Sequence, residues 1–388
     1  MTTFPAWAAW RRPSGGDLTI GIEEEFMLLD PSDWSLAFRS DEVRAALPAG
    51  LAGRVTLETH AAVMEIATGV HRRVGDAVAE LAHLRDQLVR ALGAQGLRAA
   101  VAGTHPCAVD SETVLSSHPR YRHLGDTLRG LARREPTLAT HVHIGVPSPT
   151  DAIRLLNRLR AHLPLLLALS ANSPFWRGRP SGFASTRTTL FDAFPRSGLP
   201  RRFRGYGDWV ATVERLVRSG AINDPSFLWW DVRLQPRYGT VEVRIMDGQS
   251  TVEDVAAIAA LVQTLARLEL ERPDDAEPDA RTVELIAENR FLAARDGMAA
   301  RLIDVRSGGR VSASEQLERI VCACRRHARR LRCERELAGV RRLADRNGAV
   351  RQLAHACGDG DLRRVAAHLA DAYLPRFAHA PAIGAFAC

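Results

Sequence analysis

Strand-like and helical patterns occupy different parts of this 388-residue sequence, and that separation is the strongest constraint on its fold. Most segments in which apolar side chains alternate with period two, as in half-buried strands, lie before Val252, and nearly everything after it has helical periodicity. Strands followed by helices indicate an α+β fold: an antiparallel β-sheet flanked by helices, with a mostly helical C-terminal part, rather than a doubly wound parallel sheet. The expected strands are 18–29, 54–59, 62–68, 97–103, 139–146 and a hairpin of 227–235 with 240–247; the expected helices are 74–92, 151–170, 252–271, 279–296, 311–344 and 361–373.

Lysine is missing from the sequence, so arginine accounts for all 52 basic residues. A chain without lysine cannot form a Schiff base, anchor pyridoxal phosphate, carry an adenylated lysine or build a P-loop. Any phosphate must therefore be held by arginine, backbone amides or a metal ion. The net charge of +7 is spread over helical stretches that also carry Asp and Glu, which predicts solvated helix faces and no nucleic-acid partner.

Six cysteines are scattered along the chain instead of forming a compact disulfide framework, which predicts a reducing, cytoplasmic location. The first residues lack a signal-peptide pattern, and the longest apolar stretch, 163–171, is far below the roughly 20 residues that span a bilayer. We therefore expect no membrane partner. The cysteine- and arginine-rich segment 322–333 matches no zinc-ligand spacing and is predicted to be a helix with buried cysteines and an arginine face.

Carboxylates mark the first predicted strand. Period-two geometry places Glu23 and Glu25 on one face, about 7 Å apart along the strand. Two carboxylates this close repel unless a cation lies between them, although the solvent face of an edge strand would explain the pair equally well. Glu24 points to the opposite face with the aliphatic residues, where it needs a partner or a position near the strand end.

Two further predicted strands add acidic and imidazole side chains. Glu65 has apolar neighbours in sequence, where a carboxylate is more often bound than idle, while Glu58 lies in a more polar strand end. His141 and His143 alternate with apolar residues and so share a face, which is one way to present two metal ligands. A core histidine bonded to a neighbouring strand is the competing interpretation.

Arginine completes the set of candidate residues. Arg244 shares a strand face with Glu242, and Arg187 lies in the Gly-, Pro- and Ser-rich stretch 172–226, where we expect functional loops. A planar guanidinium suits a carboxylate or phosphate, although a solvated loop arginine explains Arg187 equally well. Together these residues predict a sheet face that binds hard cations, Mg²⁺ or Mn²⁺ in preference to Zn²⁺; Mg²⁺ in such sites typically bridges substrate phosphates.

Longer segments extend the pattern in order along the chain: GIEEEF, VMEIATGV, AGTHP, HVHIGV, LPLLLALSANSPFW, GFASTRT, WWDVRLQPRYGTVEVRIMD, ENRFLAARDG with LID after it, and NGAVRQ. From about residue 18 to about residue 370, the sequence resembles the carboxylate–amine ligases of the glutamate–cysteine ligase type 2 family. The resemblance implies a glutamine-synthetase-like fold whose sheet holds ATP and Mg²⁺ on a carboxylate-lined concave face. It also implies that a carboxylate is phosphorylated to an acyl phosphate, which an amine then attacks to give an amide.

The same resemblance implies roles for individual residues. Arg187 would hold the substrate carboxylate, with His141 as a second substrate-binding residue. Thr186 and Thr140, which precede these two, depart from the family pattern and leave the substrates open. The implied metal ligands are Glu23, Glu25, Glu58, Glu65, His143 and Glu242; the implied nucleotide-binding residues are Glu23, Glu25 and Arg244; the implied catalytic residues are Arg244, Arg187 and Glu65.

We therefore expect an ATP-dependent ligase that forms carbon–nitrogen bonds between a small-molecule carboxylate, such as the amino acid glutamate, and an amine. The expected organisation is an N-terminal extension (1–17), a single catalytic domain (18–375; sheet-forming 18–250, mainly helical 251–375) and a C-terminal tail (376–388). The C-terminal helices are expected either to cover the sheet or to offer a homo-oligomer surface. Two alternatives stay open: a metal-dependent hydrolase that uses His141 and His143, and a non-catalytic nucleotide-binding homologue.

Overall fold

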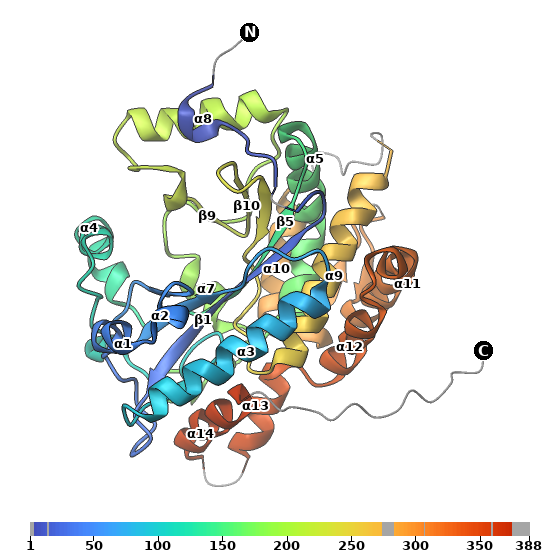
Figure 1. The fold of residues 1–388 in the computed structure, drawn as a ribbon. Helices are drawn as coiled ribbons and strands as arrows, with labels where there is room; N and C mark the ends of the chain where they lie inside the picture. The colour runs from blue at the N-terminus through green and yellow to red at the C-terminus, as the bar shows by residue number, and fades with distance from the viewer. Residues whose placement is uncertain (1–3, 14, 274–282, 306, 358–359, 375–388) are drawn as a thin grey trace.

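One antiparallel sheet organises the molecule (Figure 1). The computed structural model describes residues 4–13, 15–273, 283–305, 307–357 and 360–374. The strand order is β10-β11-β5-β1-β3-β2, and β4 pairs with the far end of β1. The predicted α+β fold with an antiparallel sheet is confirmed. The strands are β1 (Ile20–Leu29), β2 (Val55–Leu57), β3 (Val63–Ala67), β4 (Arg98–Ala100), β5 (Thr140–Gly145), β10 (Val232–Gln235) and β11 (Thr240–Val243).

The period-two pattern of β1 separates a helix-covered face from an open face. Ile20, Ile22, Phe26 and Leu28 are buried in the main core. That face is packed by α3 (Val74–Gly93) and α9 (Val252–Glu271), which cross the sheet side by side in Figure 1. The alternate residues of the first half of β1 are only partly buried, so the sheet leaves a polar face free for a site.

Glu24 is the one acidic residue of β1 on the helix-covered face. It is fully buried and paired with Arg85 of α3, whose Nε donates to Glu24 Oε1 at 2.9 Å. The predicted need for a partner is thus confirmed, because a buried carboxylate without a hydrogen-bonding cation would be costly.

Two long predicted helices are broken in the structure. The segment 151–170 forms α5 (Pro149–Leu159) and α6 (Leu163–Ser170), because Pro164 lacks an N–H and its ring disfavours a continuous helix. The segment 311–344 forms α11 (Ala313–Leu331) and α12 (Glu334–Asp345), since Arg332 adopts a left-handed φ of 56° that ends α11. In the predicted cysteine helix, Cys324 and Cys333 are buried but Cys322 is exposed.

Other helices were absent from the sequence-based expectation. They are α1 (Ser40–Ala46), α2 (Ala49–Ala52), α4 (Pro119–Leu128), α7 (Thr186–Phe191), α8 (Tyr206–Arg218) and α13 (Gly348–Ala356). The C-terminal part also contains α10 (Val283–Asp296) and α14 (Leu362–Tyr373), close to their expected bounds. Residues 274–282, which include the start of the expected helix 279–296, and the expected tail 376–388 lie outside the described residues. Within the described part of the chain, no helix combines the length and apolar character needed to span a membrane.

Candidate active site

Four neighbouring strands carry the acidic and imidazole residues to one place. In the register of the sheet, Glu25 of β1 lies opposite Glu65 of β3, and Glu23 of β1 lies opposite His141 of β5. On the other side of β5, His143 lies opposite Glu242 of β11. Because side chains two residues apart share a face, this register gathers residues that are up to 219 positions apart in the sequence (Glu23 to Glu242).

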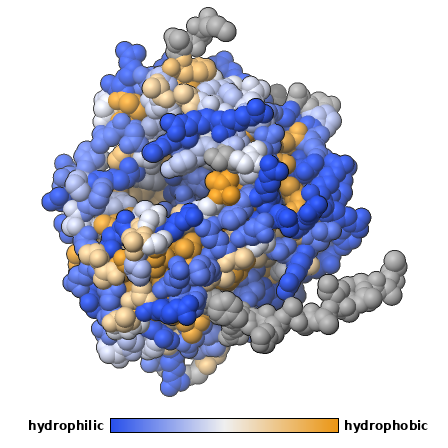
Figure 2. All heavy atoms as spheres, viewed as in Figure 1, coloured by the Kyte–Doolittle hydropathy of each residue, from blue (hydrophilic) through white to orange (hydrophobic). Residues whose placement is uncertain are grey.

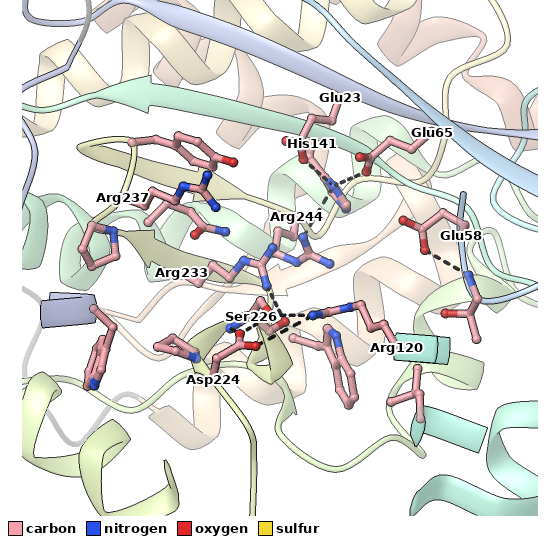
Figure 3. Close-up of a pocket in the computed structure, with 18 of the residues that line it drawn as sticks. Glu23, Glu58, Glu65, Arg120, His141, Asp224, Ser226, Arg233, Arg237 and Arg244 are labelled. Atoms are coloured by element: carbon pink, nitrogen blue, oxygen red, sulfur yellow. Dashed lines mark hydrogen bonds and ion pairs between the residues drawn. The ribbon is translucent and has the colours of Figure 1, made fainter. Parts of the chain in front are cut away.

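His141 lies at the centre of the carboxylates. Its ring is almost completely buried, and its Nε2 has no hydrogen-bond partner. Figure 3 shows it between Glu23 and Glu65, above Arg244. The Nδ1 atom lies 3.4 Å from Glu23 Oε2, 3.9 Å from Glu65 Oε2 and 3.9 Å from Glu242 Oε1, and the Nε2 atom lies 4.0 Å from Glu25 Oε1.

Two overlapping groups of these side chains could hold a metal ion. One consists of Glu23, His141 and Glu242, and the other of Glu25, Glu65 and His141; in each group the candidate ligand atoms lie within 4.8 Å of one another. Carboxylate oxygens outnumber imidazole nitrogens in both, which is the donor set that favours Mg²⁺ or Mn²⁺. His141, expected at the substrate, is therefore the histidine that both candidate metal groups share.

The carboxylates on the β3 side are crowded in a way that a cation would relieve. Burial, followed by the charge of Glu25, raises the pKa of Glu58 to about 8. Burial, together with the charges of Glu23 and Glu58, raises the pKa of Glu65 well above its usual range. Desolvation and like charges both disfavour ionised carboxylates, and a bound divalent cation reverses that balance.

Glu242 is held by cationic and amide groups. Arg233 Nε donates to its Oε2 at 2.7 Å, Gln235 Nε2 donates to the same atom at 2.7 Å, and Arg244 binds Oε1. Burial alone would raise the pKa of Glu242, but Arg233 and Arg244 outweigh it and hold the pKa well below its usual range. The carboxylate therefore remains ionised, and it orients two guanidinium groups towards the cavity.

His143 is tied to both neighbouring strands. Its Nε2 lies 3.2 Å from Glu23 Oε1, and its Nδ1 lies 3.0 Å from Thr240 Oγ1. It belongs to neither candidate metal group found among the described residues. Its expected role as a ligand stays a prediction, while its contacts orient Glu23.

Arg187 lies at the start of the short helix α7, next to the part of the carboxylate cluster that contains Glu25 and Glu58. Its guanidinium donates to the backbone oxygens of Ile245 at 3.0 Å and Arg244 at 3.3 Å. The Nε atom is buried and has no hydrogen-bond partner. Arg187 lines a small recess that it shares with Glu25, Glu58 and Arg244 and with the aromatic residues Phe191, Phe194 and Trp229.

A cavity of about 780 Å³ covers the cluster. The face of the molecule shown in Figure 2 is mostly hydrophilic, with scattered hydrophobic patches. Sequence reasoning missed part of its lining, although the hairpin offered one signal: Arg233 pairs directly with Glu242, so both residues had to share a face. Gln235, two residues after Arg233 on β10, shares that face as well. No short-range pattern pointed to the others. The missed lining residues include Trp7, Arg11, Arg120, Tyr121, Asp224, Ser226, Arg233, Gln235, Arg237 and Tyr238.

This sheet and its carboxylate–arginine face, together with the similarities to known proteins, define the class: an ATP-dependent ligase that forms carbon–nitrogen bonds. The chain belongs to the glutamate–cysteine ligase family 2 (GCS2), whose sequence model matches residues 19–368. Two relatives from Rubrobacter xylanophilus, provisionally named glutamate–cysteine ligases 2-1 and 2-3, are 38% and 39% identical. Their alignments cover 94% and 91% of this chain and 96% of each relative. The hydrolase alternative is not favoured.

Solved structures show how widely the fold is shared. Glutamate–cysteine ligase from Francisella tularensis, crystallised in complex with AMP, superposes with a TM-score of 0.69 at 12% identity over 95% of this chain and 91% of that one. A bifunctional glutathione synthetase from Pasteurella multocida gives a TM-score of 0.68 at 15% identity; the match covers 92% of this chain and 52% of that longer one. At these identities the likeness establishes the fold alone.

Proposed function

We propose that this ligase activates a small carboxylic acid with ATP and joins it to an amine at the sheet face described above. The observation that carries the proposal is the convergence of Glu23, Glu25, Glu65 and Glu242 around His141, with Arg244 beside them. Carboxylates that can hold cations, next to arginines that can meet phosphate, are the groups that phosphoryl transfer requires.

The donor set fits Mg²⁺ or Mn²⁺. The buried, unpartnered Nε2 of His141 and the crowded carboxylates Glu58 and Glu65 are unsatisfied groups that a divalent cation would satisfy. Glu23, Glu25, Glu65, Glu242 and His141 would hold it, with Glu58 and His143 as further predicted ligands. Bound there, the metal would neutralise phosphate charge and favour departure of ADP.

The first step transfers the γ-phosphoryl group. A substrate carboxylate oxygen attacks the γ-phosphorus, the bond to ADP breaks, and an acyl phosphate forms. Arg244, anchored by Glu242, lies 3.5 Å from His141 Nδ1 and is placed to stabilise the charge on the transferred group. Arg233, anchored on the same carboxylate, offers a second guanidinium from the next strand.

The second step forms the amide. The amine attacks the acyl carbon, the C–O bond to phosphate breaks, and the amine nitrogen loses a proton to a nearby base. We assign the acyl end of the reaction to the recess of Arg187, because a rigidly held guanidinium suits a substrate carboxylate. Glu65, which faces both His141 and the cavity, keeps its predicted catalytic assignment.

The names of the relatives support amino-acid substrates, glutamate as the carboxylate and cysteine as the amine. The aromatic residues that line the recess near Arg187 are also compatible with a different amino acid in place of glutamate or cysteine. The five free cysteines in the described chain favour the predicted cytoplasmic setting, in which ATP and Mg²⁺ are available. Assembly into a homo-oligomer stays a prediction.

The experiment that tests the proposal is ADP release with Mg²⁺-ATP across a matrix of amino acids as carboxylates and amines. Release should require one of each and fall by about 10²-fold or more in Glu242→Gln, which weakens the anchor of two arginines. Glu284→Gln, an exposed acid on α10, is the matched control and should behave as the wild type. Release without a carboxylate, or hydrolysis without nucleotide, would contradict the proposal.

A further inference from the structure

Residues 4–13, here called the N-terminal strap, are built into the candidate active site. The strap is anchored on α8, where Tyr206 donates from its hydroxyl to Ala8 O at 2.6 Å and Trp7 Nε1 donates to Glu214 Oε2 at 2.9 Å. It continues past the end of β5, where Trp10 Nε1 donates to Val146 O at 3.1 Å. The strap, which belongs to the predicted N-terminal extension, therefore packs against α8 and against the end of β5.

The β10–β11 turn is shaped to receive the strap. Arg11 N donates to Pro236 O at 2.9 Å, so the strap is bonded to the turn. Gly239 has a φ of +67°, and a Cβ there would lie only 2.0 Å from Arg11 O. Glycine is thus required both by the backbone conformation and by the close approach of the strap.

Four strap residues line the cavity that covers the carboxylates: Ala6, Trp7, Ala9 and Arg11, of which Trp7 and Arg11 carry the large side chains. Trp7 already uses its only polar atom on Glu214, so it offers the cavity apolar aromatic surface. The turn adds Arg237 and the half-exposed Tyr238 to the same end. This end therefore combines aromatic rings with guanidinium groups and lacks the acidic cluster.

The opposite end has different chemistry. Figure 3 shows Arg237 at one side of the cavity, Glu58 and Arg120 at the other, and His141 and Arg244 between them. The recess of Arg187 adjoins the Glu58 side. If the phosphates bind beside His141 and Arg244, and the acyl substrate binds on the Glu58 side, the base and sugar of the nucleotide must occupy the end of the cavity that the strap lines.

We propose that the N-terminal strap forms a wall of the nucleoside subsite, with Trp7 as a specificity-determining residue that packs against the base and Arg11 as a second contact. The inference rests on the proposed function, because it takes the middle of the cavity to be the phosphate site. It adds a binding role for a segment that precedes the first strand of the sheet. Aromatic rings suit this task, since every base has a π-face on which they can stack.

Calorimetric titration of the full chain with Mg²⁺-ADP and with Mg²⁺-tripolyphosphate tests this assignment. Trp7→Ala should weaken ADP binding about tenfold and leave tripolyphosphate binding within about twofold of the wild type. Trp7→Phe keeps the aromatic surface and loses only the Glu214 bond, so it should restore ADP binding. Equal weakening of both ligands in Trp7→Ala would indicate a structural effect and overturn the inference, as would an unchanged ADP affinity.

Arg11 and Arg12 provide a matched pair, because both are exposed and only Arg11 lines the cavity. Arg11→Ala should weaken ADP binding about fivefold, whereas Arg12→Ala should leave it unchanged. Equal effects of the two substitutions would mean that Arg11 acts only through its long-range positive charge, and would contradict its assignment as a contact residue. A wild-type protein that binds no Mg²⁺-ADP would instead overturn the proposed function itself, so the two failures are distinguishable.

Discussion

Among single residues, buried imidazoles show how the surroundings select one protonation state. His105 lies in the AGTHP segment and is almost fully buried. Its Nε2–H donates to Trp34 O at 2.9 Å, and its Nδ1 accepts from the backbone N–H groups of Cys107 and Ala108 at 3.1 and 3.0 Å. This arrangement needs the neutral ring, because a protonated Nδ1 could not accept. Burial lowers the pKa of His105 to about 4.

The sign of the resulting pH dependence follows from this shift. An unfolded chain, with a histidine pKa near 6.5, binds the proton more readily than the folded one, so His105 should destabilise the fold as pH falls from about 6.5 towards 4. Between pH 6.5 and 5 the loss should reach about 2 kcal/mol. Urea unfolding at several pH values measures it, and His105→Gln should show a shallower slope over that interval. Identical slopes in the two proteins would contradict the assignment.

At the scale of elements, Asp247 connects the segment after β11 with α7, the helix that carries Arg187. Its Oδ2 accepts from Asn172 N at 2.8 Å and from Ser173 Oγ at 2.7 Å, while its Oδ1 accepts from Ser185 Oγ at 2.8 Å. Ser185 is the N-cap of α7. The placement of Arg187 therefore depends on a carboxylate that never reaches the cavity.

Asp247→Asn tests this positioning role. The amide replaces one acceptor oxygen with a donor, so α7 should shift while the sheet remains in place. We expect the KM for the carboxylate substrate to rise about tenfold, with the KM for ATP unchanged. Steady-state kinetics with each substrate varied in turn separates the two constants. Asp345→Asn, an exposed substitution on α12, is the control; a parallel rise in both KM values would indicate general damage instead of a shift of α7.

The same elements show what the sequence could reveal. β1, β3, β5 and the hairpin were predictable because period-two alternation is local, and it also placed the glutamates and His141 on one face. The helix α8 was missed since it has no side-chain N-cap and lies in a Gly- and Arg-rich stretch. The break at Arg332 was equally hidden, because a non-glycine residue in the left-handed region leaves no compositional sign.

The site was predictable to a similar extent. Its strand residues stand at alternate positions of short sequence motifs, which a local pattern can reveal. Arg120, Arg187 and the N-terminal strap reach the site through long-range packing that no local pattern encodes. Arg187 illustrates the limit: its segment suggested function, but only the structure shows that it lines a recess together with Glu25 and Glu58.

For the molecule as a whole, Arg85 connects the sheet to distant parts of the chain. Besides Glu24 on β1, it donates to Ser250 O at 3.0 Å and Gln249 O at 2.9 Å, just before α9. Its guanidinium also lies over the ring of Tyr373 at 4.3 Å, at the end of α14. One buried side chain of α3 thus links the first strand, the central helix and the C-terminal helix.

Arg85→Leu should therefore lower the stability of the entire fold. It leaves Glu24 buried without its cation, which costs about 3–5 kcal/mol when one partner of a buried pair is removed. Urea unfolding should show one transition with a lower midpoint and an unchanged slope, because the linked elements unfold together. The double variant Glu24→Met/Arg85→Leu should recover most of the loss, since it removes the stranded carboxylate. Arg90→Ala, at an exposed position of α3, should change stability by less than about 0.5 kcal/mol. A loss below about 1 kcal/mol in Arg85→Leu, or a separate early transition of α14, would mean that Arg85 does not link these elements into one cooperative unit.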